Sequence, residues 1–263
     1  MKKAILSFST VLLFSGFANA QDVADASAPP DSKGIKEQKL RFGAYVAPTM
    51  SWMKPANSKS NDGVYNVSNN GSKIGFTWGL LVDYWFADNY ALATGLQVNS
   101  TGGQIRATRI GDPPVGTAVY NADFKYALQY LELPLNLKLK TSPMGKGVYF
   151  FGQAGVTAGM NIGKKATYTV TSTDNSVSSE EKVKIAGTLS IAPLTIQLNI
   201  GAGAQYPFSD RLTAYAGLFF NNGFAPDATN PAKYNFPYSA TMGSFSDGNV
   251  RLNNLALRLG LYF

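Results

Sequence analysis

The chain ends in the stretch Leu255-Ala256-Leu257-Arg258-Leu259-Gly260-Leu261-Tyr262-Phe263. Every odd-numbered position in it is leucine or phenylalanine, whereas the even-numbered positions carry alanine, arginine, glycine and tyrosine. Successive side chains of a β-strand point to opposite faces of the sheet. The stretch therefore predicts a strand with one wholly apolar face and one small or polar face.

The same alternation recurs along the chain from Leu40 onward. Between Tyr130 and Lys140, for example, leucines occupy every odd position, and Glu132, Pro134, Asn136 and Lys138 occupy even ones. A period of two residues is typical of strands with one buried face. We count eight such stretches, which predict strands over Leu40–Met53, Lys73–Phe86, Tyr90–Thr108, Phe124–Lys140, Val148–Ile162, Ser190–Phe208, Arg211–Phe220 and Arg251–Phe263.

The composition excludes several classes of enzyme. Among 263 residues there is no cysteine and no histidine. Disulfides, thiol catalysis, cysteine-ligated metals and Ser-His-Asp triads are therefore excluded, together with most catalytic metal sites. We expect a protein that is not an enzyme and has no cofactor or metal. The enzymatic alternative is an outer-membrane hydrolase or acyltransferase that works without histidine.

The first residues have the features of an export signal. Met1-Lys2-Lys3 is positively charged, Ala4 to Phe17 is mostly apolar, and Ala18-Asn19-Ala20 forms a small-residue cleavage site. This pattern predicts a secretory signal peptide over residues 1–20, with an anchoring helix as the alternative. Residues 21–39 have almost no large apolar side chains and predict a flexible periplasmic leader. Residues 40–263 would then form one β-barrel domain.

The connections between the predicted strands alternate in length. The short ones are Ala87–Asn89, Thr141–Gly147 and Ser209–Asp210, and the long ones are Pro55–Ser72, Ile110–Asp123, Gly163–Leu189 and Asn221–Val250. Short periplasmic turns and long outward loops are typical of outer-membrane barrels. We therefore predict an all-β fold, an eight-stranded antiparallel up-and-down transmembrane β-barrel in the bacterial outer membrane. Both termini would be periplasmic, and membrane lipid and the barrel-assembly machinery would be partners.

A soluble barrel of the lipocalin kind is the structural alternative, because alternation alone does not show which face points inward. Aromatic residues near the strand ends favour a membrane barrel, since such rings concentrate at the two membrane surfaces. Those near the short turns are Phe42, Trp85, Phe86, Tyr90, Tyr149, Phe150, Tyr206, Phe208 and Phe263. Those near the opposite end are Trp52, Phe124, Tyr126, Phe219 and Phe220.

Two segments resemble known outer-membrane sequences. The C-terminal stretch, with Leu257, Leu259, Leu261, Tyr262 and Phe263, resembles the signal by which barrels are recognised for assembly. The segment Leu128–Lys138, which contains Tyr-Leu-Glu-Leu-Pro, resembles a strand of the PorT-like outer-membrane β-barrel family of the Bacteroidetes lineage. That family is porin-like in fold, and its namesake is an accessory of type IX protein secretion. The resemblance implies fold and location, with secretion-system proteins as partners.

Five charged residues share the polar face of the predicted strands, namely Arg41, Asp83, Glu132, Lys138 and Arg258. An eight-stranded barrel is just wide enough for side chains to fill it. We hypothesise that these residues form an ion-pair network that closes the lumen, with Glu132 paired to a basic residue on a neighbouring strand. The alternative is that they line a narrow pore and give it selectivity.

The long loops carry the remaining hypotheses about function. Gly163–Leu189 is rich in Thr, Ser and Val and predicts a hairpin extended above the membrane. Asn221–Val250 has several aromatic residues, which form either a contact surface or a lid over the barrel. The chain would act by contact, as a secretion accessory or a structural envelope protein. A small passive channel and a surface adhesin are the alternatives. No dense basic run suggests a nucleic-acid partner.

Overall fold

The computed structural model describes residues 39–56, 58–59, 65–111, 119–145, 147–184, 190–209, 211–224, 228–229 and 250–263. The predicted signal peptide, all but the last residue of the predicted leader, and most of the aromatic loop Asn221–Val250 lie outside these residues. The described part of the chain is built from β-strands. No helix within it is long and apolar enough to cross a membrane.

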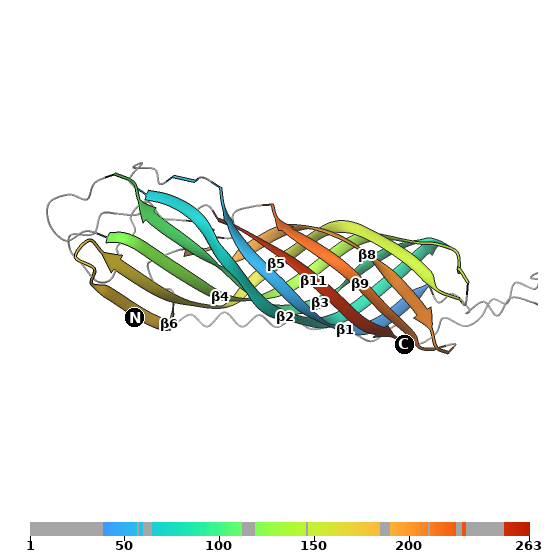
Figure 1. Cartoon of the computed structure of the whole chain (residues 1–263). Helices are drawn as coiled ribbons and strands as arrows, with labels where there is room; N and C mark the ends of the chain where they lie inside the picture. The colour runs from blue at the N-terminus through green and yellow to red at the C-terminus, as the bar shows by residue number, and fades with distance from the viewer. Residues whose placement is uncertain are drawn as a thin grey trace, which may run out of the picture. The chain divides into compact units, whose positions relative to one another are not determined.

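Eight long strands close into a ring. Each pairs antiparallel with the next long strand along the chain, and the last pairs with the first, with Gly43 opposite Tyr262. The ring closes between the blue β1 and the red β11 (Figure 1). This is the predicted eight-stranded up-and-down barrel. Its strands are β1 (Leu40–Pro55), β2 (Tyr65–Ala87), β3 (Tyr90–Arg109), β4 (Val119–Lys140), β5 (Tyr149–Ser172), β8 (Leu194–Pro207), β9 (Thr213–Gly223) and β11 (Val250–Tyr262).

Three short strands lie outside the ring. β6 (Val177–Lys184) pairs with β5, while β7 (Ser190–Ile191) pairs with β10 (Ala228–Thr229), which also pairs with β11. β5 and β6 form the hairpin that was predicted from the segment Gly163–Leu189.

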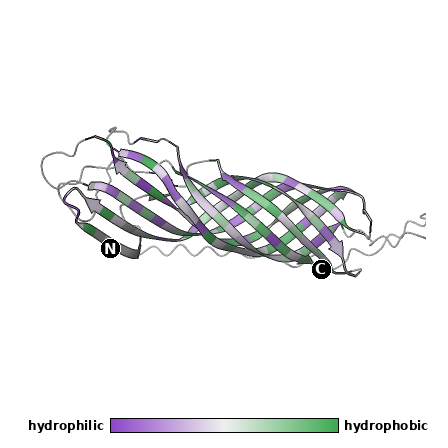
Figure 2. Cartoon of the chain, in the orientation of Figure 1, coloured by the Kyte–Doolittle hydropathy of each residue, from purple (hydrophilic) through white to green (hydrophobic). Residues whose placement is uncertain are grey.

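The apolar face of the strands points outward. In β4, Leu133 and Leu137 are 56% and 46% exposed, whereas their sequence neighbours Glu132 and Lys138 are each 1% exposed. Figure 2 shows hydrophobic and hydrophilic residues alternating along the strands of the barrel. A surface of exposed leucines is unfavourable in water but suits hydrocarbon. This orientation argues against the soluble alternative, in which the leucines would be inside.

The three predicted short turns join strands at one end of the barrel. The turn at Asp88-Asn89 places Ala87 opposite Tyr90. The connection between β4 and β5 contains Gly145 and Gly147, whose φ angles of 55° and 89° favour glycine. In the third turn, the hydroxyl of Ser209 accepts a hydrogen bond from the amide of Leu212 at 3.2 Å. All three connections are therefore tight.

Strands β2 to β5 extend beyond the apolar band. The outward side chains of β2 are apolar or aromatic from Ile74 to Phe86, a span of about 40 Å of strand. At a tilt of about 40° this span is ~30 Å high, close to the thickness of a membrane's hydrocarbon core. The rest of β2, from Tyr65 to Ser72, carries polar exposed residues and continues past the band, at the end opposite the short turns.

Several of the expected strand boundaries were wrong. β2 begins at Tyr65 instead of Lys73, and β4 begins at Val119 instead of Phe124, because both strands still pair with their neighbours in the extension. β5 continues to Ser172 instead of ending at Ile162, because it pairs with β4 and then with β6 in the extension. The stretch Ser190–Phe208, expected as one strand, is broken at Ala192-Pro193 into β7 and β8. Proline has no amide hydrogen to donate to a sheet, which explains the break.

The aromatic prediction was right at one end and partly wrong at the other. Around the short turns, most of the expected rings are exposed on the outer face, among them Phe42, Phe86, Tyr90, Phe150, Tyr206, Phe208 and Phe263, whereas Trp85 is buried inside. At the opposite end, Trp52 stacks on Phe220, with ring centroids 6.1 Å apart. Phe124, Tyr126 and Phe219 are instead buried in the interior, because their positions fall on the inward parity.

Candidate functional site

The lumen of the barrel is the place where the predicted charged residues meet. Arg41, Asp83, Glu132, Lys138 and Arg258 come from four strands, β1, β2, β4 and β11. Their alternation with apolar residues turns all five toward the inside, where four of them are at most 3% exposed and Arg41 is half-buried. The five predicted residues therefore bring three basic and two acidic side chains into the lumen.

Asp83 and Lys138 form a buried salt bridge. The Nζ atom of Lys138 lies 2.6 Å from Oδ2 of Asp83 and also donates a hydrogen bond of 2.7 Å to the hydroxyl of Tyr262. The same ammonium group lies 4.7 Å from the ring centroid of Phe151. Two charges removed from water need such close partners, because the cost of desolvating them is otherwise not offset.

Arg41 and Arg258 contact aromatic rings. The guanidinium carbon of Arg41 lies 5.0 Å from the ring centroid of Tyr262, and its Nη2 donates a hydrogen bond of 2.6 Å to Thr213. The guanidinium carbon of Arg258 lies 4.8 Å from the ring of Tyr45 and 4.2 Å from the ring of Phe219. Cation–π contacts of this kind hold both cations in place, and neither has a salt bridge to another described residue.

Glu132 is bound by amides. Its Oε1 accepts a hydrogen bond of 2.9 Å from Nδ2 of Asn99, and its Oε2 accepts one from Nε2 of Gln97. Asn99 in turn accepts a hydrogen bond from Thr77, and Gln97 accepts one from the hydroxyl of Tyr45. The expectation that Glu132 pairs with a basic residue on a neighbouring strand was wrong. The donors on neighbouring β3 are neutral amides, which hydrogen-bond both oxygens of the buried carboxylate.

The five residues are thus not one ion-pair network. Among the described residues, Asp83 and Lys138 are the only two of the five that form a salt bridge. Arg41 joins this pair through Tyr262, whereas Glu132 belongs to a separate cluster of amides and hydroxyls.

A ladder of amides fills the other side of the lumen. Nδ2 of Asn199 donates to Oδ1 of Asn221, and Nδ2 of Asn221 donates to Oδ1 of Asn254 at 2.6 Å. Nε2 of Gln153 donates to Asn199 at 3.4 Å. This ladder, which crosses β5, β8, β9 and β11, was not predicted. Gln197 and Asn199 lie on the polar face of their predicted strand, so the sequence indicated amide side chains in the lumen. It did not indicate their hydrogen-bond partners, because these depend on which strands are neighbours.

These side chains leave almost no free space between them. Asp83, Lys138 and Arg258 line an internal cavity of only about 10 Å³, together with the rings of Phe151 and Phe219. A cavity of that size holds one water molecule at most. At this level the lumen is filled by the protein's own side chains.

The residues of the expected assembly signal divide between the two faces of β11. Leu257, Leu259, Leu261 and Phe263 are exposed on the outer face, whereas Tyr262 is 2% exposed and bonded to Lys138 inside. The penultimate aromatic residue is therefore also part of the lumen's hydrogen bonding.

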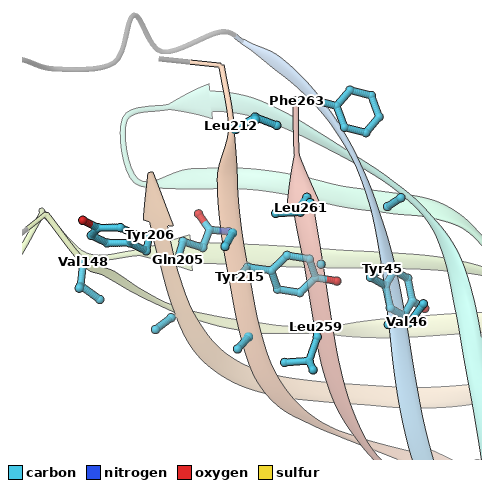
Figure 3. A pocket seen from close by; sticks show the side chains of 15 residues that line it. Tyr45, Val46, Val148, Gln205, Tyr206, Leu212, Tyr215, Leu259, Leu261 and Phe263 are labelled. Atoms are coloured by element: carbon cyan, nitrogen blue, oxygen red, sulfur yellow. The ribbon is translucent and has the colours of Figure 1, made fainter. Parts of the chain in front are cut away.

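An apolar groove lies on the outside of the barrel near the short turns. It has a volume of about 860 Å³, with Leu259 and Leu261 of β11 on one side and Tyr206 of β8 on the other (Figure 3). The small side chains Ala44, Ala204, Ala214 and Ala216 line it. Because the groove lies among outward apolar residues, it is part of the outer wall and not of the lumen.

The extension has an apolar interior and a polar exterior. Inside, Tyr65, Val67, Ile105 and Phe124 belong to one buried apolar cluster. Outside, Arg106 and Asp123 form a bidentate salt bridge with distances of 2.6 and 2.8 Å. The hydrogen bond from Arg106 to Asp123, together with the negative charge of Asp123, raises the pKa of Arg106. Buried apolar contacts hold the extension together, so it is an ordered sheet with a water-compatible outer surface.

Taken together, a closed antiparallel sheet, an apolar outer band and a polar filled interior define an integral β-barrel of the outer-membrane type. The described residues include no cluster of three or more Asp or Glu side chains that could hold a metal ion. The chain belongs to the family described as the outer membrane protein beta-barrel domain, whose sequence model matches residues 19–226. It is therefore a protein of the bacterial outer membrane.

Several solved structures of small outer-membrane barrels are similar to the chain. Neisserial surface protein A is 12% identical, with a TM-score of 0.39, over 86% of this chain and 98% of that one. OprG from Pseudomonas aeruginosa is 15% identical, with a TM-score of 0.41, over 88% and 99%. Ail of Yersinia pestis is 15% identical, with a TM-score of 0.31, over 86% and 100%. No curated protein matches the sequence significantly.

Proposed function

We propose that this chain is a non-enzymatic, non-conducting barrel that anchors an extramembrane sheet, and that the sheet acts by binding other proteins. The observation that supports the proposal is a contrast between the part of the strands inside the apolar band and the part that extends beyond it. Within the apolar band, buried charges, amides and rings fill the lumen. Beyond the band, β2 to β6 form an ordered sheet with a polar outer face.

The extension is large enough to serve as a contact surface. The part of β2 from Tyr65 to Ser72 alone spans about 25 Å of strand. The hairpin of β5 and β6 adds a further strand at its edge, with the hydroxyls of Thr169 and Ser179 3.2 Å apart on its exposed face. Interfaces typically have polar rims of this kind.

The partner class that we propose is the machinery of type IX protein secretion. The support is the resemblance of Leu128–Lys138 to the PorT-like family. A structural role in the envelope is the alternative within the same contact function. In both cases the short-turn end, with both termini, would face the periplasm, because short turns are periplasmic in outer-membrane barrels.

Affinity purification from native membranes tests the contact function. The intact chain is compared with a variant in which residues 167–182, the outer part of the β5–β6 hairpin, are replaced by a short turn. We expect specific proteins to co-purify with the intact chain and to be lost with the variant, which still folds because the lumen contacts remain. Equal recovery with both chains would contradict a role for the hairpin. Normal secretion of cargo in a deletion strain would contradict the secretion role.

Conductance in planar bilayers tests the filled lumen. We expect no stable conductance from the intact barrel. The matched control is the double variant Arg258→Ala with Phe219→Ala, which removes two side chains that line the small cavity and should give measurable current. Stable and reproducible conductance of the intact protein would contradict the filled lumen. It would instead support the alternative function, a narrow channel lined by the polar residues.

A further inference from the structure

Two like charges lie directly opposite each other at the upper edge of the apolar band. Lys54 of β1 is paired in register with Arg251 of β11, and both side chains are exposed. Side chains directly opposite in an antiparallel pair have Cβ atoms about 5 Å apart, and like charges at that spacing are destabilising. Neither cation forms a salt bridge among the described residues. The fold thus brings together two cations that nothing in the described barrel neutralises.

Their position relates them to the membrane surface. Two residues further into the band on β1, Trp52 stacks on Phe220, and the outward residues below are Met50 on β1 and Leu255 on β11. Aromatic rings of this kind lie at the level where hydrocarbon meets headgroups. Lys54 and Arg251 are one step above the rings, on the side of the extension. That is the height at which a lipid carries its charged headgroup.

We propose that Lys54 and Arg251 bind the phosphate of an anionic membrane lipid whose acyl chains lie against the outer wall below them. A phosphate between the two cations would turn their mutual repulsion into two charge-assisted contacts. Arg251 offers a planar guanidinium that binds phosphate oxygens in a bidentate manner, and Lys54 offers a compact positive charge. The stack of Trp52 on Phe220 provides an apolar surface for the upper part of the chains.

The stability of the barrel in two kinds of bilayer tests this site. The purified chain and the variants Arg251→Gln and Lys54→Gln are reconstituted into phosphatidylcholine, with and without phosphatidylglycerol. The thermal midpoint of unfolding is then measured. For the intact chain, we expect the anionic lipid to raise the midpoint. For each variant, we expect at least half of this rise to be lost. In phosphatidylcholine alone, each variant should be as stable as the intact chain or more stable, because one repelling charge is gone.

Lys125→Gln is the matched control. It removes one exposed positive charge from the same end of the barrel, but Lys125 is two residues from Asp123 on the same face of β4 and lies further from the band. It should keep the full rise in the midpoint. If the anionic lipid raised the thermal midpoint equally in Arg251→Gln, Lys54→Gln and Lys125→Gln, its effect would depend on net charge alone. That result would overturn the proposal.

Two further arms identify the occupant. Inorganic phosphate added to phosphatidylcholine bilayers should leave the midpoint unchanged. An equal rise with inorganic phosphate would show a site for free anions and overturn the lipid assignment. Native mass spectrometry of the intact chain should show bound phosphatidylglycerol that Arg251→Gln retains less well, and equal retention would also contradict the site. Neither result depends on whether the extension binds a protein partner.

Discussion

The ammonium group of Lys138 lies 2.6 Å from the carboxylate of Asp83, and both side chains are almost completely buried inside the barrel. The two residues are 55 positions apart in the sequence and come from β4 and β2, which are separated by β3. The contact therefore passes over β3, where the residues paired with Asp83 and Lys138 are the small Ala93 and Ala91. It is the one place where the predicted charged residues meet as a pair.

Removing one member of this pair should be more harmful than removing both. We expect Lys138→Met to destabilise the barrel by about 3–5 kcal/mol, because it leaves Asp83 buried without its cation. The double variant Asp83→Leu with Lys138→Met should lose less than either single variant, so the two single losses should be strongly non-additive. Urea unfolding in detergent micelles, followed by intrinsic fluorescence, gives these values. Simple additivity of the two single losses would show that the pair is not coupled.

The backbone at Gly201 lies close to the ring of Phe219, and this contact predicts a difference in stability between two glycine variants. A Cβ atom added at Gly201 would overlap the ring of Phe219, whereas one added at Gly152 would come no closer than 4.0 Å to another group. We expect Gly201→Ala to cost about 1–3 kcal/mol of unfolding free energy. Gly152→Ala should stay within about 0.5 kcal/mol of the parent chain.

The second substitution Phe219→Leu should restore part of the stability lost in Gly201→Ala, since it removes the overlapping ring atoms. The same urea titration measures all three chains. If Gly152→Ala were as damaging as Gly201→Ala, the loss would come from the backbone and not from the lumen packing.

The last two residues should have separable roles. Tyr262 is buried and bonded to Lys138, whereas Phe263 is exposed on the outer face. We expect Tyr262→Phe to cost about 1.5–3 kcal/mol of stability, the usual range for a hydrogen bond to a charged group, and to leave the rate of assembly unchanged. Phe263→Ser should slow assembly in cells and change the stability of the purified barrel little. Pulse-labelling with gel-mobility detection of folded barrel measures assembly, and a reversed pattern would contradict the C-terminal assembly signal.

The tip of the β5–β6 hairpin predicts a pH effect outside the membrane. The hydroxyl and the amide of Ser176 both donate to Oδ1 of Asp174, at 2.6 and 2.9 Å, and these hydrogen bonds lower the pKa of Asp174. A lowered pKa in the folded state means that the contact stabilises the hairpin above the unfolded pKa, near 3.9, and is lost as the pH falls through the folded value.

Ser176→Ala should therefore raise the pKa of Asp174 toward its ordinary range. Carboxyl-carbon NMR of the chain labelled at aspartate measures this shift in micelles. An unchanged pKa of Asp174 in the variant would exclude the hydroxyl of Ser176 as a cause.

The orientation of the strands and the content of the lumen could be predicted to different degrees. The alternation around Glu132 correctly predicted that the leucines share one face and the polar groups the other, because the face on which a side chain lies depends only on its own strand. The partner of Glu132 could not be predicted. Whether a carboxylate meets a lysine, an arginine or an amide depends on the register of β3 against β4, which no single strand contains.

The difference between the pattern along one strand and the pairing between strands also explains the errors in the predicted strand boundaries. The apolar period ends where the hydrocarbon ends, so the stretch after Ile162 no longer looked like a strand. The backbone of β5 nevertheless continues to Ser172, because the neighbouring strands still supply hydrogen-bond partners there. The inward positions of the extension are apolar, which is the reverse of the barrel below.

By itself, the order of residues determined the eight alternating strands, because the face on which a side chain lies follows from a period of two along its own segment. The lengths of the connections and the aromatic residues near the strand ends then indicated that the apolar side faces lipid. Only the tertiary structure decided that Lys138 meets Asp83, that amides hold Glu132, and that Lys54 lies opposite Arg251. These contacts depend on how far each strand is shifted against its neighbours when the ring closes, and that shift is a property of the whole sheet.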